Sequence, residues 1–142
     1  MRDNSFRGKN RLTGSWVYGD LRNYERTGAK AIFSHELLHR VEVDPDTVGQ
    51  YSGIFTKDEV EDGDTLCTFI YEGDIVEPVL TEGIHNGFSW GRHVVVFDRG
   101  AFCLKDRRGQ ITPMCNYSVN VKFKVLGNVY DNPELMEGVT NA

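Results

Sequence analysis

The segment His35-Glu36-Leu37-Leu38-His39 holds the residue types best suited to chemistry in this chain. On a helix, histidines at positions i and i+4 lie on one face and can hold a single Zn²⁺, while the glutamate between them can activate a water molecule. His35, Glu36 and His39 are therefore the candidate metal-binding and catalytic residues of a zinc-dependent hydrolase.

The residues around this segment favour a different structure. Residues 41–43 alternate apolar and polar, and Asp44-Pro45 ends the segment, so no long helix is predicted. In a strand, residues four apart are separated by roughly 13 Å, too far to share one zinc ion. A third histidine at the expected spacing is missing, and Glu59 or Glu61 would have to serve from an acidic stretch. We favour a surface or hairpin segment without metal, and retain the hydrolase as the alternative.

Other residues with metal-binding or nucleophilic side chains are scattered along the chain. His85, His93 and Cys115 could meet only through the fold, and we interpret them as structural residues. Nucleophile elbows, phosphate-binding loops and dinucleotide fingerprints are absent from the sequence. The sequence therefore predicts no catalytic residue and no cofactor.

Basic residues are concentrated at Arg107-Arg108, close to Lys105. The formal net charge of −5 argues against a protein that grips nucleic-acid backbones, so we interpret this site as a charged hairpin tip. A nucleic-acid accessory factor remains a further alternative. Six aromatic residues could form a base-stacking platform but more often belong to a core: Trp16, Tyr18, Tyr51, Phe69, Tyr71 and Phe97.

Length and composition set the class of the protein. The chain has 142 residues, which predicts a single domain over 1–142, and its 39% hydrophobic and 26% charged residues are typical of a soluble protein. Three cysteines without a CxxC pair favour reduced thiols. No apolar leader or membrane-spanning run is present, so we expect a cytoplasmic location without membrane association.

Short β-type segments separated by turn residues run along the whole sequence. The predicted strands include 16–21, 94–97 (buried on both faces) and 119–125, in which Val119, Val121, Phe123 and Val125 would face the core. Gly53 is expected to end a strand, and the acidic stretch 56–65 to form an exposed loop. Turns are predicted at 72–74, 98–100 and 106–109.

The C-terminal region predicts a short helical turn capped by Asn132, with Pro133 at its first position. Leu135 and Met136 could dock this turn onto a sheet, and residues 136–142 would form a loose tail. The predicted architecture is mainly β, with small bent sheets or a partly open barrel and this helical turn.

Five blocks of sequence, in order, resemble the YopX-like family over residues 6–135. The blocks are Phe6-Arg7-Gly8-Lys9, Thr13-Gly14 with Trp16-Val17-Tyr18-Gly19, Thr47-Val48-Gly49-Gln50-Tyr51-Ser52-Gly53, Tyr71-Glu72-Gly73-Asp74-Ile75-Val76 and Gly127-Asn128-Val129-Tyr130-Asp131-Asn132-Pro133-Glu134-Leu135. The connection between Gly53 and Tyr71 is longer and more acidic than is usual in the family. The resemblance implies a β-rich, biochemically uncharacterised protein of bacteriophages, prophages or mobile elements, without catalytic residues to carry over.

These observations predict a non-enzymatic binding or assembly module in the cytoplasm of a bacterial host cell. Self-association is expected because the 16–21 segment, with Trp16 and Tyr18, has few charges to protect it as a sheet edge. A homo-oligomer with Trp16 or Tyr18 near the contact is the specific hypothesis. An unknown host or phage protein is the other possible partner.

Overall fold

The structure is a computed structural model that describes residues 5–59 and 63–137. The chain folds into two compact units, residues 1–51 and 52–142. The described part is mainly β, as predicted, and forms two antiparallel sheets that stay open rather than closing into a barrel. Among the described residues, no helix has the length and apolar composition needed to cross a membrane.

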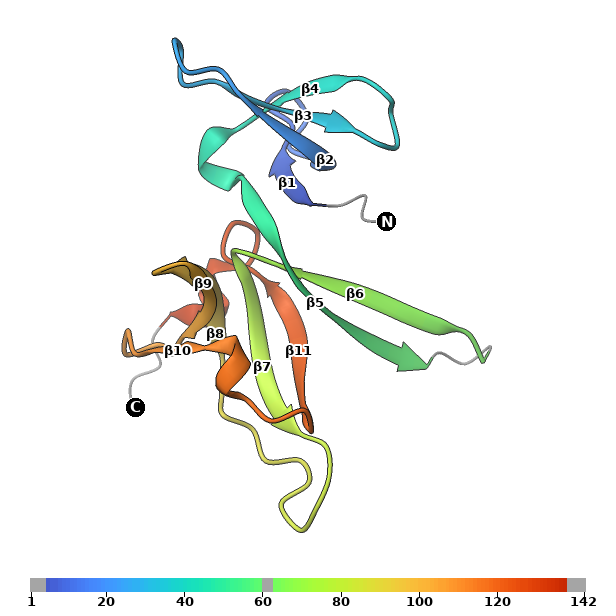
Figure 1. Cartoon of the computed structure of the whole chain (residues 1–142), viewed down its shortest axis with the longest axis vertical. Helices are drawn as coiled ribbons and strands as arrows, with labels where there is room; N and C mark the ends of the chain where they lie inside the picture. The colour runs from blue at the N-terminus through green and yellow to red at the C-terminus, as the bar shows by residue number, and fades with distance from the viewer. Residues whose placement is uncertain (1–4, 60–62, 138–142) are drawn as a thin grey trace. The chain divides into compact units, whose positions relative to one another are not determined.

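The first unit is built from four short antiparallel strands and the beginning of a fifth (Figure 1). In hydrogen-bonded order they are β4, β3, β2, β1 and β5. Their bounds, with the intervening 3-10 turn, are β1 (Phe6–Lys9), β2 (Trp16–Asn23), β3 (Lys30–Ser34), β4 (Arg40–Val43), η1 (Pro45–Thr47) and β5 (Gly49–Glu59). Asp44 caps η1 by accepting a hydrogen bond from Asp46 N.

Apolar residues on alternate positions of these strands form the core of the first unit. Val17, Ile32, Val41 and Val43 are buried there, and Ile32 and Val43 are completely inaccessible. Each such side chain contributes about 1.5–3 kcal/mol when it is removed from water. The alternation of residues 41–43 noted in the sequence therefore belongs to a strand with one buried face.

The prediction that residues 16–21 form an unprotected edge is wrong. β2 lies inside its sheet, paired with β1 on one side and β3 on the other. Trp16 also lies beneath cations of β1, with Arg7 Cζ 4.5 Å and Lys9 Nζ 5.4 Å from its ring centroid. Trp16 and Tyr18 therefore do not lie at an open sheet edge. The two strands that flank β2 could not be identified as its neighbours from local sequence.

The second unit contains the rest of β5, the strand β6 that pairs with it, and a five-stranded sheet in the order β10-β9-β8-β7-β11. The elements are β6 (Thr65–Tyr71), β7 (Asp74–Leu80), β8 (His93–Asp98), β9 (Ala101–Lys105), β10 (Ile111–Pro113), η2 (Met114–Asn116), β11 (Val121–Asn128) and η3 (Pro133–Met136). The pairing of β11 with β7 is irregular between Val125 and Gly127, which marks a β-bulge.

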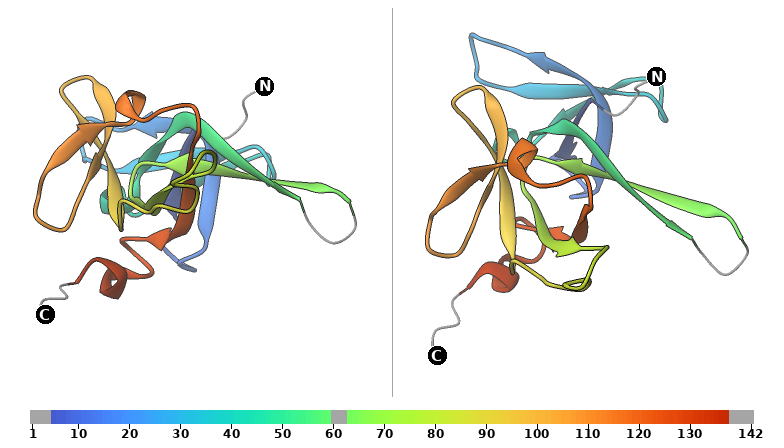
Figure 2. Two further views of the ribbon diagram at one scale, coloured as in Figure 1. Left: turned by 90° about the horizontal axis from the view of Figure 1, so that it is seen from below. Right: turned by 60° about the horizontal axis from the view of Figure 1, so that its bottom comes forward.

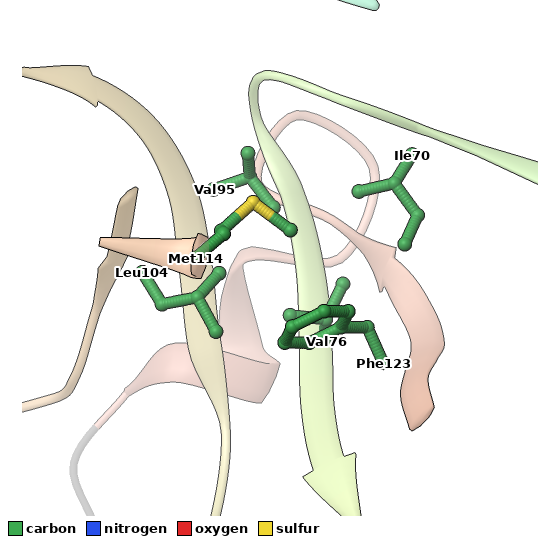
Figure 3. Packing of buried hydrophobic residues seen from close by; sticks show 6 residues of the cluster. All are labelled: Ile70, Val76, Val95, Leu104, Met114 and Phe123. Carbon is green, nitrogen blue, oxygen red and sulfur yellow. The ribbon is translucent and has the colours of Figure 1, made fainter. Parts of the chain in front are cut away.

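One hydrophobic cluster organises the second unit. Figure 3 shows side chains from β6, β7, β8, β9, η2 and β11 converging there: Ile70, Val76, Val95, Leu104, Met114 and Phe123. Ile54 of β5 packs against the same cluster. The cluster therefore fixes the base of the β5–β6 hairpin against the five-stranded sheet.

The predicted turns at 72–74 and 98–100 are confirmed. Gly73 adopts φ = 95°, which a side chain disfavours, and Arg99 and Gly100 have φ values of 52° and 84°. Two successive positive φ values are typical of the tight turn that joins β8 to β9. Gly49 also interrupts a β-type run in the sequence, but it pairs with Arg7 in β5 and is not among the glycines with positive φ.

The β5–β6 hairpin differs most from expectation. Gly53 adopts φ = 86° but does not end the strand, because β5 continues to Glu59. Much of the acidic stretch 56–65 is therefore strand rather than loop, while residues 60–62 lie outside the described part. The hairpin projects away from the five-stranded sheet (Figure 2), and we call residues 52–59 and 63–71 the arm.

Three further expectations are corrected by burial and hydrogen bonding. β11 begins only at Val121, and Val119 is 99% exposed, because Val121 N bonds Ser118 O in a turn before the strand. Phe97 is 50% exposed, so residues 94–97 are not buried on both faces. The C-terminal turn forms as predicted, but the Asn132 side chain accepts a hydrogen bond from Asn128 N and does not cap it.

Candidate functional site

The segment with His35, Glu36 and His39 is the turn of the β3–β4 hairpin. Ser34 accepts hydrogen bonds from Leu37 N through its hydroxyl, at 2.9 Å, and from Leu38 N through its carbonyl, at 2.8 Å. Leu38 has φ = 60°, in the left-handed region. The geometry is that of a turn, so the helical face that would bring the two histidines together does not form.

The two histidines of this turn contact different groups. His35 Nε2 lies 3.4 Å from Asp20 Oδ2 on β2, and His39 Nδ1 lies 3.2 Å from the carbonyl oxygen of Arg40. His35 and Glu36 line a small cavity of about 120 Å³ next to Tyr18. The cavity has room for a few water molecules, far less than a peptide substrate requires.

The other residues considered as metal ligands lie on different elements. His85 belongs to the β7–β8 connection, His93 is buried on β8 with Nδ1 3.0 Å from Gly91 O, and Cys115 is exposed on η2. Within residues 5–59 and 63–137, no group of three or more histidine, cysteine, aspartate or glutamate residues is arranged to hold a metal ion. These residues therefore do not build a common site.

The six aromatic residues considered as a stacking platform were interpreted as core residues, and only some of them are buried. Tyr71 is 3% exposed, whereas Phe69 and Phe97 are 40% and 50% exposed. Phe69 contacts Phe55 across the arm, with ring centroids 5.9 Å apart. Its partner Phe55 is itself 43% exposed, so the pair forms an apolar surface on the arm.

Strand alternation assigns the arm two different faces. Ile54 and Ile70 point to the hydrophobic cluster, so Phe55, Cys67 and Phe69 belong to the opposite, outer face. Lys57 belongs to the same outer face, with Nζ 5.6 Å from the centroid of the Phe55 ring.

The inner face of the arm is polar beyond the hydrophobic cluster. Asp58 of β5 forms an ion pair with Lys122 of β11. A cavity of about 580 Å³ lies here, lined by Thr56, Thr68 and Lys124 among others. The ion pair and the hydrophobic cluster both contact the inner face of the arm. Within this unit they leave the outer face and the free edge of β6 accessible.

Among the described residues, four strands lie at the ends of the two sheets, and three of them carry features that block further pairing. β4 presents Arg40 and Glu42, β10 is three residues long and contains Pro113, and β11 carries Lys122 and Lys124 together with its bulge. Charge, proline, short length and bulges are the devices by which proteins protect sheet edges. The fourth terminal strand, β6, is seven residues long, reads Thr-Leu-Cys-Thr-Phe-Ile-Tyr and contains neither a charged residue nor proline.

The basic hairpin tip forms as predicted, between β9 and β10. Asp106 organises the turn by accepting hydrogen bonds from Arg108 N and Gln110 N, both at 2.9 Å. The bond from Gln110, supported by that from Arg108, lowers the pKa of Asp106 despite the opposing effect of partial burial. Nearby, burial raises the pKa of the Tyr117 phenol, and the Asp106 charge adds to this effect.

This turn forms one wall of an open pocket of about 620 Å³, which we call the arginine pocket. It is lined by Glu77, Trp90, Arg92, Asp106, Arg107 and Arg108. Arg92 and Arg107 both donate to the carbonyl oxygen of Leu135, at 3.2 and 3.5 Å. These bonds and the half-buried side chains of Leu135 and Met136 hold η3 to the second unit.

Sequence reasoning identified Arg107 and Arg108 but missed Trp90 and Arg92. The pocket joins Trp90 and Arg92 of the β7–β8 connection to residues of the β9–β10 turn, which lie far from them in sequence. No local pattern marks such a pair. The uncharged run of β6 can be seen in the sequence. Its position at the end of a sheet cannot, because that depends on which strands pair in the fold.

Comparison with known proteins agrees with the fold. The family model described as YopX protein matches residues 5–137. Protein yopX from Bacillus subtilis has a similar structure, with a TM-score of 0.54 and 21% sequence identity over 98% of this chain and 100% of that one. No curated protein matches the sequence. Because the family model spans nearly the whole chain, the chain belongs to the YopX family.

Proposed function

We propose that this protein is a non-enzymatic assembly module that associates with copies of itself through the outer edge of β6. The observation that carries the proposal is the contrast between β6 and the other three terminal strands, which are charged, short or bulged. An unprotected edge of this length is a template for another strand.

The composition of β6 suits pairing with an identical strand. Its seven residues include no charged residue, proline or glycine, and Leu66 is 55% exposed. Two copies related by a two-fold axis can pair such edges antiparallel, each using the same surface. The chain carries a net charge of −5, so copies repel one another least where they meet through an uncharged strand.

The outer face of the arm can add apolar contact to the paired edges. Phe55 and Phe69 form an exposed pair there, and a strand pairing at β6 would continue this face into the second copy. Hydrogen bonds along the edge would then define the register, and aromatic contacts would exclude water around it.

The biological setting we propose follows from the family resemblance. Proteins of this kind are expected in bacteriophages, prophages or mobile elements, in the cytoplasm of the bacterial host. Self-assembly is a role that needs no cofactor and no catalytic residue.

Cross-linking at Cys67 tests the location of the contact. Cys67 lies on β6 and is exposed, whereas Cys103 is buried, so Cys115→Ser leaves a single accessible thiol. We expect a short bismaleimide to give a covalent dimer of this variant at micromolar protein. The matched control is Cys67→Ser, which retains Cys115 and should not cross-link. Equal cross-linking of the two variants, or none in either, would contradict the proposal.

A further inference from the structure

We infer that the arginine pocket binds a nucleotide as a small molecule, with the base against Trp90 and the phosphates on the arginines. This ligand class is independent of self-association through β6. Three kinds of group converge in the pocket: guanidinium cations, an aromatic ring and carboxylates that already have hydrogen-bond donors.

The arginines of the pocket are not paired with carboxylates. Among the described residues, no ion pair within 4.0 Å involves Arg92, Arg107 or Arg108. Two of these guanidinium groups share one neutral acceptor, the Leu135 carbonyl, which leaves most of their donors available. The Arg108 side chain makes no hydrogen bond to the described residues. Guanidinium groups whose N–H donors are not engaged by a carboxylate can bind phosphate oxygens with two parallel hydrogen bonds.

The carboxylates of the pocket are satisfied from elsewhere. Asp106 accepts two backbone N–H groups of its own turn, and Glu77 accepts a hydrogen bond from the Ser89 hydroxyl. In the described part of the chain neither carboxylate forms an ion pair with an arginine of the pocket, although the charge of Arg108 acts on Asp106 at longer range. A carboxylate has further lone pairs and can accept a hydrogen bond from a sugar hydroxyl, so Glu77 suits a ribose better than a bare anion.

Trp90 supplies a fixed aromatic surface. Phe88 and Tyr117 contact its ring edge-to-face, with centroids 4.9 and 5.7 Å away, yet Trp90 remains 42% exposed. A ring held by two neighbours loses little conformational freedom when a base stacks on it. Every nucleobase has a face that can stack in this way, so the pocket need not select one base.

Size and charge favour a single nucleotide over a nucleic-acid strand. A polymer requires a basic stripe along its backbone, whereas the chain has a net charge of −5 and its arginines cluster in one pocket. The volume of about 620 Å³ lies within the range of small-molecule sites.

Equilibrium dialysis of the unaltered chain against radiolabelled ATP tests the inference, with fluorescence of Trp16→Phe as a second readout. That variant leaves Trp90 as the sole tryptophan. We expect ATP to bind saturably and to quench the fluorescence of Trp90. Inorganic triphosphate and adenosine alone should bind more weakly than ATP. Arg108→Gln should bind ATP about tenfold more weakly, because it loses a charged hydrogen bond.

The matched control is Arg99→Gln, which removes an arginine that is 93% exposed at the tip of the β8–β9 turn, outside the pocket. It should bind ATP as the unaltered chain does. Absence of saturable binding at millimolar ATP, equal losses in the two variants, or tighter binding of an oligothymidylate than of ATP would each overturn the inference.

Discussion

The rings of Phe55 and Phe69 meet across the arm, with centroids 5.9 Å apart and planes at 54°. The two residues belong to β5 and β6, on the face opposite the one that carries Ile54 and Ile70 into the hydrophobic cluster. The aromatic pair therefore links β5 to β6 on the outer face of the arm, which the hydrophobic cluster does not cover.

A double-mutant cycle at this pair should reveal direct coupling. We expect Phe55→Ala and Phe69→Ala to be less destabilising together than the sum of the single changes, by about 0.5–1.5 kcal/mol, the usual value for an aromatic pair. Urea unfolding of the four proteins at low concentration gives this coupling energy. Strict additivity would mean that the rings merely lie near one another.

Turn chemistry could be predicted from the sequence, whereas strand neighbours could not. The turns at Gly73 and Gly100 follow from glycines that tolerate positive φ, and this preference is local to the residue. The position of β2 inside its sheet depends on β1 and β3, which pair with it through the fold. Gly53 shows the same limit, because pairing with β6 extends β5 beyond a residue that usually interrupts strands.

The candidate sites follow the same division. Arg107 and Arg108 are adjacent in sequence and were found, but Trp90 joins them only through tertiary structure. The formal zinc motif was visible in the sequence but does not form a site. Its spacing brings the two histidines together only on a helix, and the segment is a turn. A motif is informative only together with the element that carries it.

Replacing Gly73 should destabilise the second unit. Its φ of 95° disfavours a side chain, and an added Cβ would lie 3.0 Å from Tyr130 Cε2. We expect Gly73→Val to lower the free energy of unfolding by more than about 1 kcal/mol. Gly100→Val is the control, because φ there is 84° and a Cβ would meet nothing within 4 Å. Thermal unfolding should show the larger loss for Gly73→Val, and equal losses would remove the steric contribution of Tyr130.

No zinc should co-purify with the protein. His35 and His39 lie in a turn and contact different groups, Asp20 and the Arg40 carbonyl. Elemental analysis of protein purified without chelators measures the metal content, with His35→Ala as the comparison. One zinc per chain that disappears in His35→Ala would instead support the hydrolase.

Acid should weaken the β9–β10 turn through Asp106. Hydrogen bonds from the backbone, chiefly from Gln110, lower the pKa of Asp106 in the folded chain. Its stabilising contribution is therefore present above the unfolded pKa, near 3.9, and is lost as the pH falls through the lower folded value. Urea unfolding between about pH 5 and about pH 2 should show a smaller acid-induced loss of stability in Asp106→Asn than in the unaltered chain. Identical pH profiles would show that the turn does not depend on this charge.

Sedimentation equilibrium at tens of micromolar protein tests the central claim, association through β6, most directly. We expect the unaltered chain to be an oligomer and Leu66→Lys to be monomeric, because a lysine in β6 would lose water if a second strand paired there, as at the protected edges of other sheets. Ile111→Lys places the same charge on β10, where Ile111 is 40% exposed, and should leave the mass unchanged. A monomeric unaltered chain, or an oligomer that persists in folded Leu66→Lys, would contradict the account.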